Sequence, residues 1–283
     1  MIKRENKVVQ WEDPDLPVGY LSVSSAQMYQ KCPKQYEFRY VLGKKSPPTV
    51  SLVEGSTYHL SMSADNERKR DTKGKESLNY DEMVNVFMES FKEGKREIED
   101  WESDTENSVY SRSKLVIGRY VNEVQSKVNS VTAVEEEFRV TIGEGEDRVP
   151  VLGYIDLVCG WGDLPKVLID YKFSNRKMEE SDVSHHTQLA IYHIVTGVKS
   201  VGIIRNERKE KGVVEATVVK SVDKQTVAMA KDLMVHVARG VKAGAFPPTD
   251  SGNWWCSPKW CGYYGMCRGC KASTTRIVKR GGK

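Results

Sequence analysis

The pattern of apolar positions predicts helices throughout the first half of the chain. Ser24 or Ser25 can cap a first helix, whose apolar and tyrosine positions recur at helical spacing. Pro33 interrupts this helix and leaves Cys32 at the break. The highly charged segment 65–79 is expected to be mobile. Further helices are expected over residues 51–63, 83–91 and 115–128.

The second half of the chain changes to strand-like patterns. Residues 131–142 alternate between polar and apolar positions, as a half-buried strand does. Residues 151–169 hold two apolar runs, and the turn-forming residues between them predict a hairpin. The elements expected next are a helix, two strands and a helix, over 181–197, 201–205, 213–219 and 222–240. This order predicts an α/β core with a mixed sheet.

The hairpin carries three ionisable side chains in an apolar setting. Asp156 lies in the first strand, and Asp170 and Lys172 lie in the second. Because side chains alternate along a strand, Asp170 and Lys172 share a face and the Tyr171 carbonyl lies between them. Two buried acids beside a lysine suit metal-assisted phosphodiester hydrolysis, since buried carboxylates need a cation. A simple Asp170–Lys172 salt bridge at a sheet edge is the alternative.

The composition indicates one sizeable core and no membrane segment. The chain has 283 residues, of which 39% are hydrophobic and 29% are charged, with a formal charge of +4. This charge permits nucleic-acid binding without requiring it. Most basic runs, such as those at 68–75 and 205–211, are interpreted as solvated loops. The chain shows no signal peptide and no apolar run of membrane-spanning length, so we expect a soluble, cytoplasmic protein.

The cysteines indicate a metal or cluster site. Cys32 and Cys159 stand alone, whereas four cysteines crowd near the C-terminus, namely Cys256, Cys261, Cys267 and Cys270. Such density in an intracellular protein favours a metal centre over disulfides. The four could hold zinc locally. Alternatively, an iron–sulfur cluster could recruit Cys32 and clasp the first helix to the tail.

Several other polar residues suit a phosphate-binding site. Gln188 and Tyr192 lie four residues apart on the helix that follows the hairpin, and therefore on one face. His185 and His186 begin this helix and are interpreted as surface or substrate-contacting residues. His59 follows Gly55 in an expected helix, and as a lone histidine it is ambiguous.

Taken together, these motifs resemble the RecB-like nucleases of the PD-(D/E)XK superfamily, in the branch with a four-cysteine iron–sulfur cluster. The resemblance includes CRISPR-associated and AddB-type exonucleases. The shared segments run from Ser24 to Cys267 and keep the family order. They read SSAQMYQKCPKQYEFRY, GSTYH, GYIDLV, IDYK, QLAIY and CSPKWCGYYGMC.

The resemblance implies a restriction-endonuclease-like α/β core in which helices flank a central mixed sheet. A helical insertion and a cysteine-rich C-terminal region would be added to it. The implied parts are an N-terminal segment with a helix that contributes Cys32, a helical lobe that carries His59, the nuclease core, and the cluster region with a basic tail. Their boundaries would be 1–50, 51–130, 131–245 and 246–283.

The resemblance also implies roles for particular residues. The metal ligands would be His59, Asp156, Asp170 and the Tyr171 carbonyl. The catalytic residues would be Lys172, Asp170, Asp156, Gln188 and Tyr192. A [4Fe–4S] cluster would be held by Cys32, Cys256, Cys261 and Cys267, with zinc as the less favoured occupant. Cys270 lies just beyond this set, so the choice of four ligands stays open.

The function expected from the resemblance is a DNA exonuclease that depends on Mg²⁺ or Mn²⁺ and favours single-stranded ends. The chain has no helicase-type phosphate loop. It would therefore act alone or receive single strands from a partner, such as a helicase or a recombinase. The alternatives are a CRISPR-adaptation-type nuclease that works with a protein partner, and a cluster-bearing DNA-binding protein that does not cut.

Overall fold

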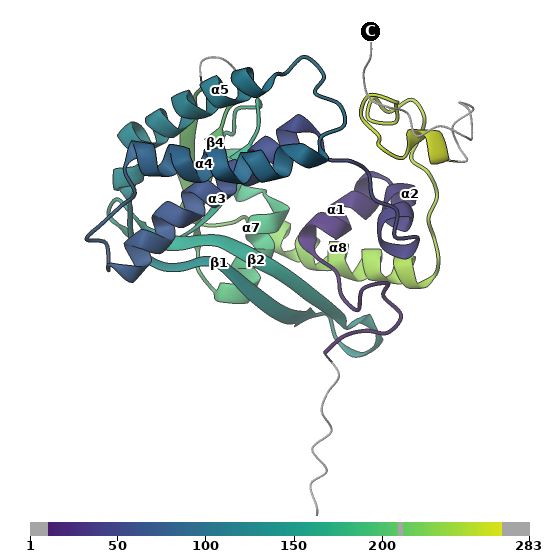
Figure 1. The fold of residues 1–283 in the computed structure, drawn as a ribbon. Helices are drawn as coiled ribbons and strands as arrows, with labels where there is room; N and C mark the ends of the chain where they lie inside the picture. Colours follow the sequence, from purple (N-terminus) through teal and green to yellow (C-terminus); the bar gives the residue numbers. More distant parts are fainter. Residues whose placement is uncertain (1–10, 209–211, 268–283) are drawn as a thin grey trace, which may run out of the picture.

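The computed structural model describes residues 11–208 and 212–267, and helices lie on both faces of a sheet in this part of the chain (Figure 1). The strands are β1 (Val128–Ile142), β2 (Val149–Trp161), β3 (Leu164–Phe173), β4 (Ser200–Asn206) and β5 (Val214–Val219). The α-helices are α1 (Val23–Lys31), α2 (Pro33–Tyr36), α3 (Val50–Asp71), α4 (Tyr80–Gly94), α5 (Glu106–Arg119), α6 (Glu180–Ser184), α7 (Thr187–Thr196) and α8 (Lys224–Lys242). Short π and 3-10 segments are η1 (Glu37–Val41), η2 (Lys95–Glu97), η3 (Tyr120–Val124), η4 (Gln125–Lys127), η5 (Gly145–Asp147) and η6 (Tyr264–Met266).

The described strands form one mixed sheet in the order β1-β2-β3-β4-β5. β3 and β4 are parallel, and the other neighbouring pairs are antiparallel. The connection between β3 and β4 contains α6 and α7, because parallel strands need a long crossover. The predicted α/β core with a mixed sheet and a β2–β3 hairpin is confirmed. Because β3 is the central strand, the sheet-edge placement in the alternative interpretation is wrong. The Asp170–Lys172 salt bridge of that interpretation is present, with 2.8 Å between Nζ and Oδ2.

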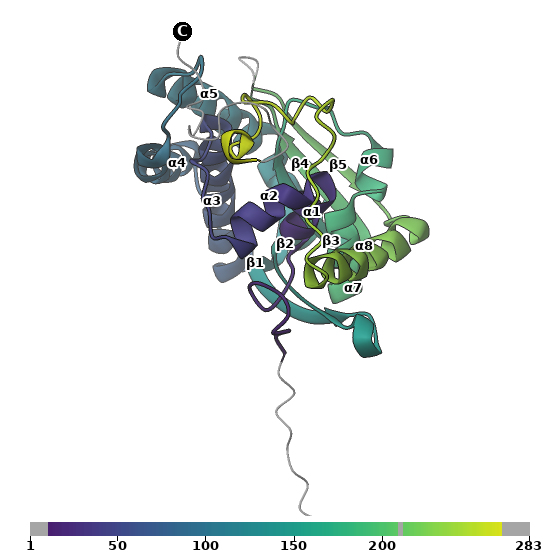
Figure 2. The same cartoon turned by 90° about the vertical axis from the view of Figure 1, so that its right-hand side faces the viewer.

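Each face of the sheet has its own apolar core. Leu168 and Ile203 belong to the core that includes α7 and α8, whereas Ile169 and Ile204 belong to the core that includes α3, α4 and α5. Figure 2 shows these two groups of helices on opposite sides of the sheet. Alternation along β3 therefore directs Asp170 and Lys172 toward the side of α7 and the Tyr171 side chain toward the side of α3.

Local sequence sets several helix ends. Ser22, rather than Ser24 or Ser25, caps α1, and its hydroxyl accepts a hydrogen bond from the backbone N–H of Ser25. Gly197 ends α7 with a left-handed φ of 69°, a conformation that glycine adopts without strain.

Two helices differ from the predictions because of long-range contacts. Helix α3 continues to Asp71, well beyond the predicted end at 63, since Asp65 and Lys69 are buried and paired rather than mobile. The helix predicted over 181–197 is broken at His185 and His186. The Ser184 carbonyl accepts a hydrogen bond from the N–H that precedes α8 instead of one from its own helix. Among the described helices, we find none whose length and apolar content would let it cross a bilayer.

Candidate active site

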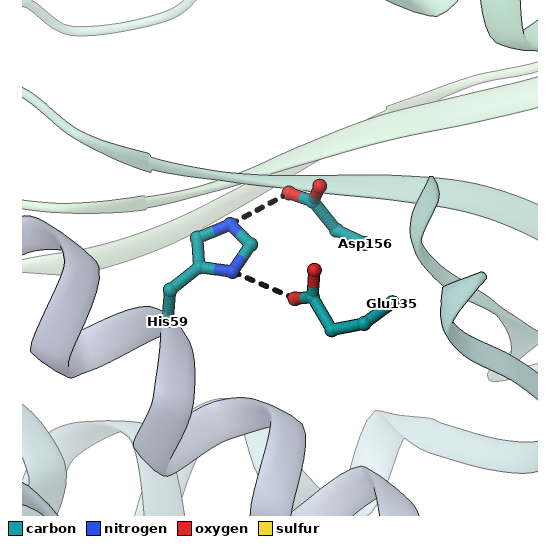
Figure 3. Close-up of side chains that lie close together, drawn as sticks. All are labelled: His59, Glu135 and Asp156. Atoms are coloured by element: carbon teal, nitrogen blue, oxygen red, sulfur yellow. Dashed lines mark hydrogen bonds and ion pairs between the residues drawn. The ribbon is translucent and has the colours of Figure 1, made fainter. Parts of the chain in front are cut away.

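Three side chains from different elements meet at the edge between α3 and the sheet (Figure 3). His59 comes from α3, Glu135 from β1 and Asp156 from β2. The His59 Nε2 atom lies 2.8 Å from Asp156 Oδ2, and Nδ1 lies 2.8 Å from Glu135 Oε1. The ligand atoms of the three residues lie within 4.8 Å of one another. Nitrogen and carboxylate oxygen donors at this separation fit a divalent cation such as Mg²⁺ or Mn²⁺.

Glu135 is a site residue that the sequence reasoning missed. It lies in the run Glu135–Glu136–Glu137, in which all three side chains are exposed. Such a charged run in a strand is usually an ordinary solvent-facing segment. In the structure its φ is 47°, a left-handed conformation that is strained for a residue with a side chain and is often found at functional sites. The Ser63 hydroxyl also donates to Glu135 Oε1 over 2.9 Å. No short sequence motif would have singled out this glutamate.

Asp156 and Asp170 lie close together on neighbouring strands. The backbone N–H of Tyr171 donates to Asp156 Oδ2 over 2.9 Å, which fixes this carboxylate against β3. Asp170 is only 1% exposed. Burial raises the pKa of Asp170 to about 7, and the negative charge of Asp156 adds to this effect while Lys172 opposes it. A carboxyl group in this environment is stabilised in its charged form by a nearby cation.

Within the described part of the chain, one oxygen of Asp170 is held by an ion pair alone. Asp170 Oδ2 lies 2.8 Å from Lys172 Nζ, yet it accepts no well-aligned hydrogen bond from the described residues. The ion pair with Lys172 provides the charge compensation that this buried oxygen needs. Of the predicted metal ligands, His59 and Asp156 belong, with Glu135, to the group whose ligand atoms lie within 4.8 Å of one another, whereas Asp170 is outside this group and pairs with Lys172.

A chain of hydrogen bonds leads from Asp170 to α7. Lys172 Nζ donates to Asp170 Oδ1 over 3.1 Å and to Gln188 Oε1 over 2.7 Å. Gln188 Nε2 then donates to Tyr192 Oη over 2.6 Å. Burial raises the pKa of Tyr192, and the nearby carboxylates add to this, so its hydroxyl stays protonated. The four-residue spacing thus brings Gln188 and Tyr192 to the hairpin, as the sequence predicts.

The two histidines before α7 have different environments. His185 is exposed, and its Nδ1 lies 2.8 Å from the Ser181 carbonyl oxygen. His186 has a buried Nδ1 without a hydrogen-bond partner in the described part of the chain. Burial lowers the pKa of His186 to about 4, and the charge of Lys172 lowers it further, whereas Asp182 opposes them. His186 is therefore a neutral neighbour of Lys172 near neutral pH, and neither histidine lies in the group around His59.

His59 itself is held by its two acidic neighbours. Burial alone would lower its pKa, but the hydrogen bonds to Asp156 and Glu135 outweigh burial and raise the pKa to about 10. The protonated ring donates to both carboxylates. Binding of a metal ion through a ring nitrogen requires that nitrogen to lose its proton, so metal binding and protonation compete at this residue.

Four cysteines line a second, smaller pocket. Cys32, at the junction of α1 and α2, faces Cys256, Cys261 and Cys267 of the C-terminal segment across this pocket. The backbone N–H of Thr249 lies 3.4 Å from the sulfur of Cys32, and the side-chain amide of Gln35 lies 3.2 Å from that of Cys261. N–H donors directed at sulfur are a feature of iron–sulfur sites. Cys159 lies elsewhere, in the core beneath α3. Cys270 lies outside the described residues.

Searches of curated proteins and of solved structures give different results. A search of curated proteins gives no match. Among solved structures, the chain is similar to the "Putative exonuclease" from Eubacterium rectale, with 13% identity, a TM-score of 0.47, and coverage of 100% of this chain and 96% of that one. It is also similar to SSO0001, with 13% identity, a TM-score of 0.36, and coverage of 75% and 84%.

A family model adds a match over most of the chain. The model described as "PD-(D/E)XK nuclease superfamily" matches residues 20–268, a range that contains His59, the β2–β3 hairpin and α7. Two acids and a lysine on adjacent strands, with a metal-compatible donor set beside them, agree with the name of this family. The chain belongs to the PD-(D/E)XK nuclease superfamily.

Proposed function

We propose that this chain is a metal-dependent deoxyribonuclease that degrades single-stranded DNA from its ends. The observation that carries the proposal is a pair of buried acids on β2 and β3, Asp156 and Asp170, which are hydrogen-bonded to a histidine of α3 and a lysine of β3. The histidine and the lysine both line one open cleft. The cleft has a volume of about 580 Å³, and His59, Glu135 and Lys172 are among its lining residues. The preference for single-stranded ends rests on the resemblance to RecB-like nucleases.

In this proposal the acids and the histidine hold Mg²⁺ or Mn²⁺. The ligands would be His59, Asp156, Asp170 and the Tyr171 carbonyl, and Glu135 is close enough to join them. When bound, the ion would neutralise charge on the phosphate and lower the pKa of a water molecule. The neighbouring N–H of Tyr171 keeps Asp156 in place.

Lys172 and the two α7 residues would position the reacting groups. Lys172 Nζ is fixed between Asp170 and Gln188, where its remaining proton can hold the attacking water or a phosphate oxygen. Gln188 keeps this orientation because its amide also contacts Tyr192. Tyr192 accepts that hydrogen bond through Oη, so its own proton can be donated to a phosphate oxygen.

We further propose that the cysteine pocket holds a [4Fe–4S] cluster with a structural role. Cys32, Cys256, Cys261 and Cys267 would be its ligands. The proposal is supported by their position around one pocket and by the N–H groups beside two of the sulfurs. Phe38 and Tyr263 pack beside Cys261 and would shield the cluster from water. Zinc is the alternative occupant.

The test of the nuclease proposal is digestion of single-stranded DNA by wild-type protein and by Lys172→Ala, with Mn²⁺ or Mg²⁺. The DNA carries a label at either end, and a circular single strand is included. Lys166→Ala is the matched control, because Lys166 is exposed near the start of the same strand. We expect metal-dependent loss of linear DNA with wild type and Lys166→Ala, and at least a hundredfold loss of activity in Lys172→Ala.

The outcomes separate the alternatives. The label that disappears first gives the polarity, and an intact circle supports action from ends. If wild-type protein with its iron content verified leaves every substrate whole with either metal, the nuclease proposal fails. The DNA-binding alternative that does not cut would then be the better account.

A further inference from the structure

A second open hollow adjoins the proposed catalytic groups on the side of α7. It has a volume of about 450 Å³, and Asp156, Gln188 and Tyr192 form its inner wall. The outer wall comes from the segment before α1, the start of α1, η1 and β2, through residues such as Tyr20, Ser22, Ser24, Tyr40 and Tyr154. We call it the tyrosine hollow. It shares Asp156 with the metal site, so a ligand in it would lie next to the scissile phosphate.

The tyrosine rings of this hollow are braced from behind. Tyr154 is 48% exposed, and its hydroxyl donates to Glu137 over 2.9 Å. The Tyr20 ring packs on Trp11 with 5.8 Å between centroids, and the Tyr40 ring packs on Tyr36 at 4.8 Å. Rings that are already held in place lose little conformational entropy when a planar ligand stacks on them.

Charge and hydroxyl groups surround these rings. The guanidinium of Arg39 lies 5.7 Å from the centroid of Tyr40, just outside the lining of the hollow. The guanidinium of Arg139 lies 5.4 Å from the centroid of Trp11 and is paired with Glu137 at 2.8 Å. Arg39 is therefore the arginine with the freer charge. The serines at positions 22 and 24 add hydroxyl groups at the start of α1. Arginines and hydroxyl groups beside aromatic rings are the combination that holds phosphates and bases of single-stranded nucleic acid.

The catalytic cleft on the other side of the metal site has a different surface. Its exposed apolar side chains are Leu52 and Leu60, which are 62% and 54% exposed. Its tyrosines, Tyr58 and Tyr171, are buried and cannot stack on a ligand. Phe173 also lines this cleft, where it is half-buried and packs against Tyr58. Of the two hollows that meet at the proposed metal site, the tyrosine hollow presents three tyrosines that are not buried, whereas the cleft presents none.

We propose that the tyrosine hollow is a base-stacking subsite for the nucleotides of single-stranded DNA that adjoin the scissile phosphate. This inference rests on the proposed function and specifies how the substrate strand is held. Single strands fit because their base faces are free, whereas the bases of a duplex are already stacked on one another. Tyr154 and Tyr20 are the residues that stack on bases, and Arg39 contacts the backbone.

The experiment measures binding of a fluorescent single-stranded oligonucleotide to the Lys172→Ala protein, which leaves the DNA uncut. In this background we compare Tyr154→Ala and Tyr20→Ala with Tyr154→Phe and Tyr80→Ala. Tyr154→Phe keeps the ring and loses only the bond to Glu137. Tyr80 is also exposed, at 38%, but begins α4 in the helical lobe. We expect about tenfold weaker binding for Tyr154→Ala and Tyr20→Ala and little change for the controls.

A second oligonucleotide separates base stacking from charge. An abasic strand of the same length keeps the phosphates but has no base faces, so Tyr154→Ala should bind it as well as its parent does. The inference is overturned if Tyr154→Ala binds normal DNA like Tyr80→Ala, or if it loses the same factor on abasic DNA. This binding readout needs no cleavage. The subsite and the nuclease proposal can therefore fail independently, the first in binding and the second in digestion.

Discussion

At the scale of single residues, burial and neighbouring charges together decide how the ionisable groups of the site behave. Asp170 is almost fully buried and has a pKa raised to about 7, whereas His59 has a pKa raised to about 10 by the acids on either side of it. A bound cation would favour the charged form of the first and the deprotonated form of the second. Glu135 belongs to the same group, since one of its oxygens contacts both His59 and Ser63.

Replacement of Glu135 by glutamine should weaken metal binding more than it slows the reaction. The amide keeps the shape of the side chain but removes the charge that faces His59. We expect the Mn²⁺ concentration for half-maximal activity to rise about tenfold, with a smaller change in kcat at saturating Mn²⁺. Glu136→Gln is the matched control, because Glu136 is exposed and lies beside Glu135 on β1. Equal metal dependence in both variants would show that Glu135 has no part in holding the ion.

The buried His186 should make part of the free energy of unfolding sensitive to acid. Its pKa falls from an ordinary value of 6.5 to about 4 on folding, mainly because of burial. The unfolded chain therefore takes up a proton as the pH drops below 6.5, while the native protein does not until about pH 4. The free energy of unfolding should decrease as the pH falls through this range. Urea unfolding at several pH values should show a smaller decrease in His186→Gln, and identical pH slopes in the two proteins would contradict the assignment.

At the scale of elements, a buried polar network joins α3 to its neighbours. Asp65 is fully buried and pairs with Lys69 Nζ at 3.1 Å, and it also accepts from the Leu78 N–H and the Gln125 side chain. One position further along α3, Asn66 donates to Tyr171 Oη over 2.8 Å. The network fixes the rotation of the helix that carries His59 relative to the strand that carries Asp170.

Lys69→Met should destabilise the protein by about 3 kcal/mol, because it leaves the Asp65 carboxylate buried without its cation. The double variant Asp65→Asn/Lys69→Met should be more stable than the single one, since the uncompensated charge is gone. Arg68→Met is the neighbouring control. Its ion pairs are solvent-exposed, so it should cost less than about 1 kcal/mol. Urea unfolding measures these variants together with the single variant Asp65→Asn, and additive effects of the Asp65 and Lys69 changes would show that the pair contributes no coupling energy.

At the scale of the whole molecule, residues from both ends of the described chain meet at the cysteine pocket. The loop after α8 returns to α1 and α2, where the Thr249 N–H contacts Cys32 and Tyr263 packs on Phe38. Both views show the C-terminal segment beside α1 and α2 (Figures 1 and 2). A cluster bound there would join two segments that are more than two hundred residues apart in sequence.

Cys32→Ala should therefore remove iron and visible absorption and loosen the C-terminal segment. The measurements are iron content and the rate of trypsin cleavage at Lys259, which is exposed in that segment. Cys159→Ala is the control, because Cys159 is equally buried but does not line the pocket. Loss of iron from neither variant, or from both, would overturn the proposed ligand set. Zinc found in place of iron after anaerobic purification would favour the alternative occupant.

Local sequence by itself determined the features that depend on spacing along one element. Alternation in a strand fixes which of Asp170, Tyr171 and Lys172 share a face, and the helical repeat brings Gln188 and Tyr192 together. The hairpin, the order of strands and helices, and the glycine that ends α7 follow from the same short-range rules. These features were predicted because the backbone geometry of a strand or a helix relates neighbouring side chains whatever else they contact.

Tertiary structure alone decided which distant elements meet. Glu135 joins the site only because β1 pairs with β2 opposite Asp156, and its neighbours in sequence give no sign of it. Charged residues at 65 and 69 become helical because they are buried together, and the helix at 181–197 breaks because the segment before α8 takes one of its carbonyl groups. Burial and long-range hydrogen bonds are properties of the packed chain, so no local pattern contains them.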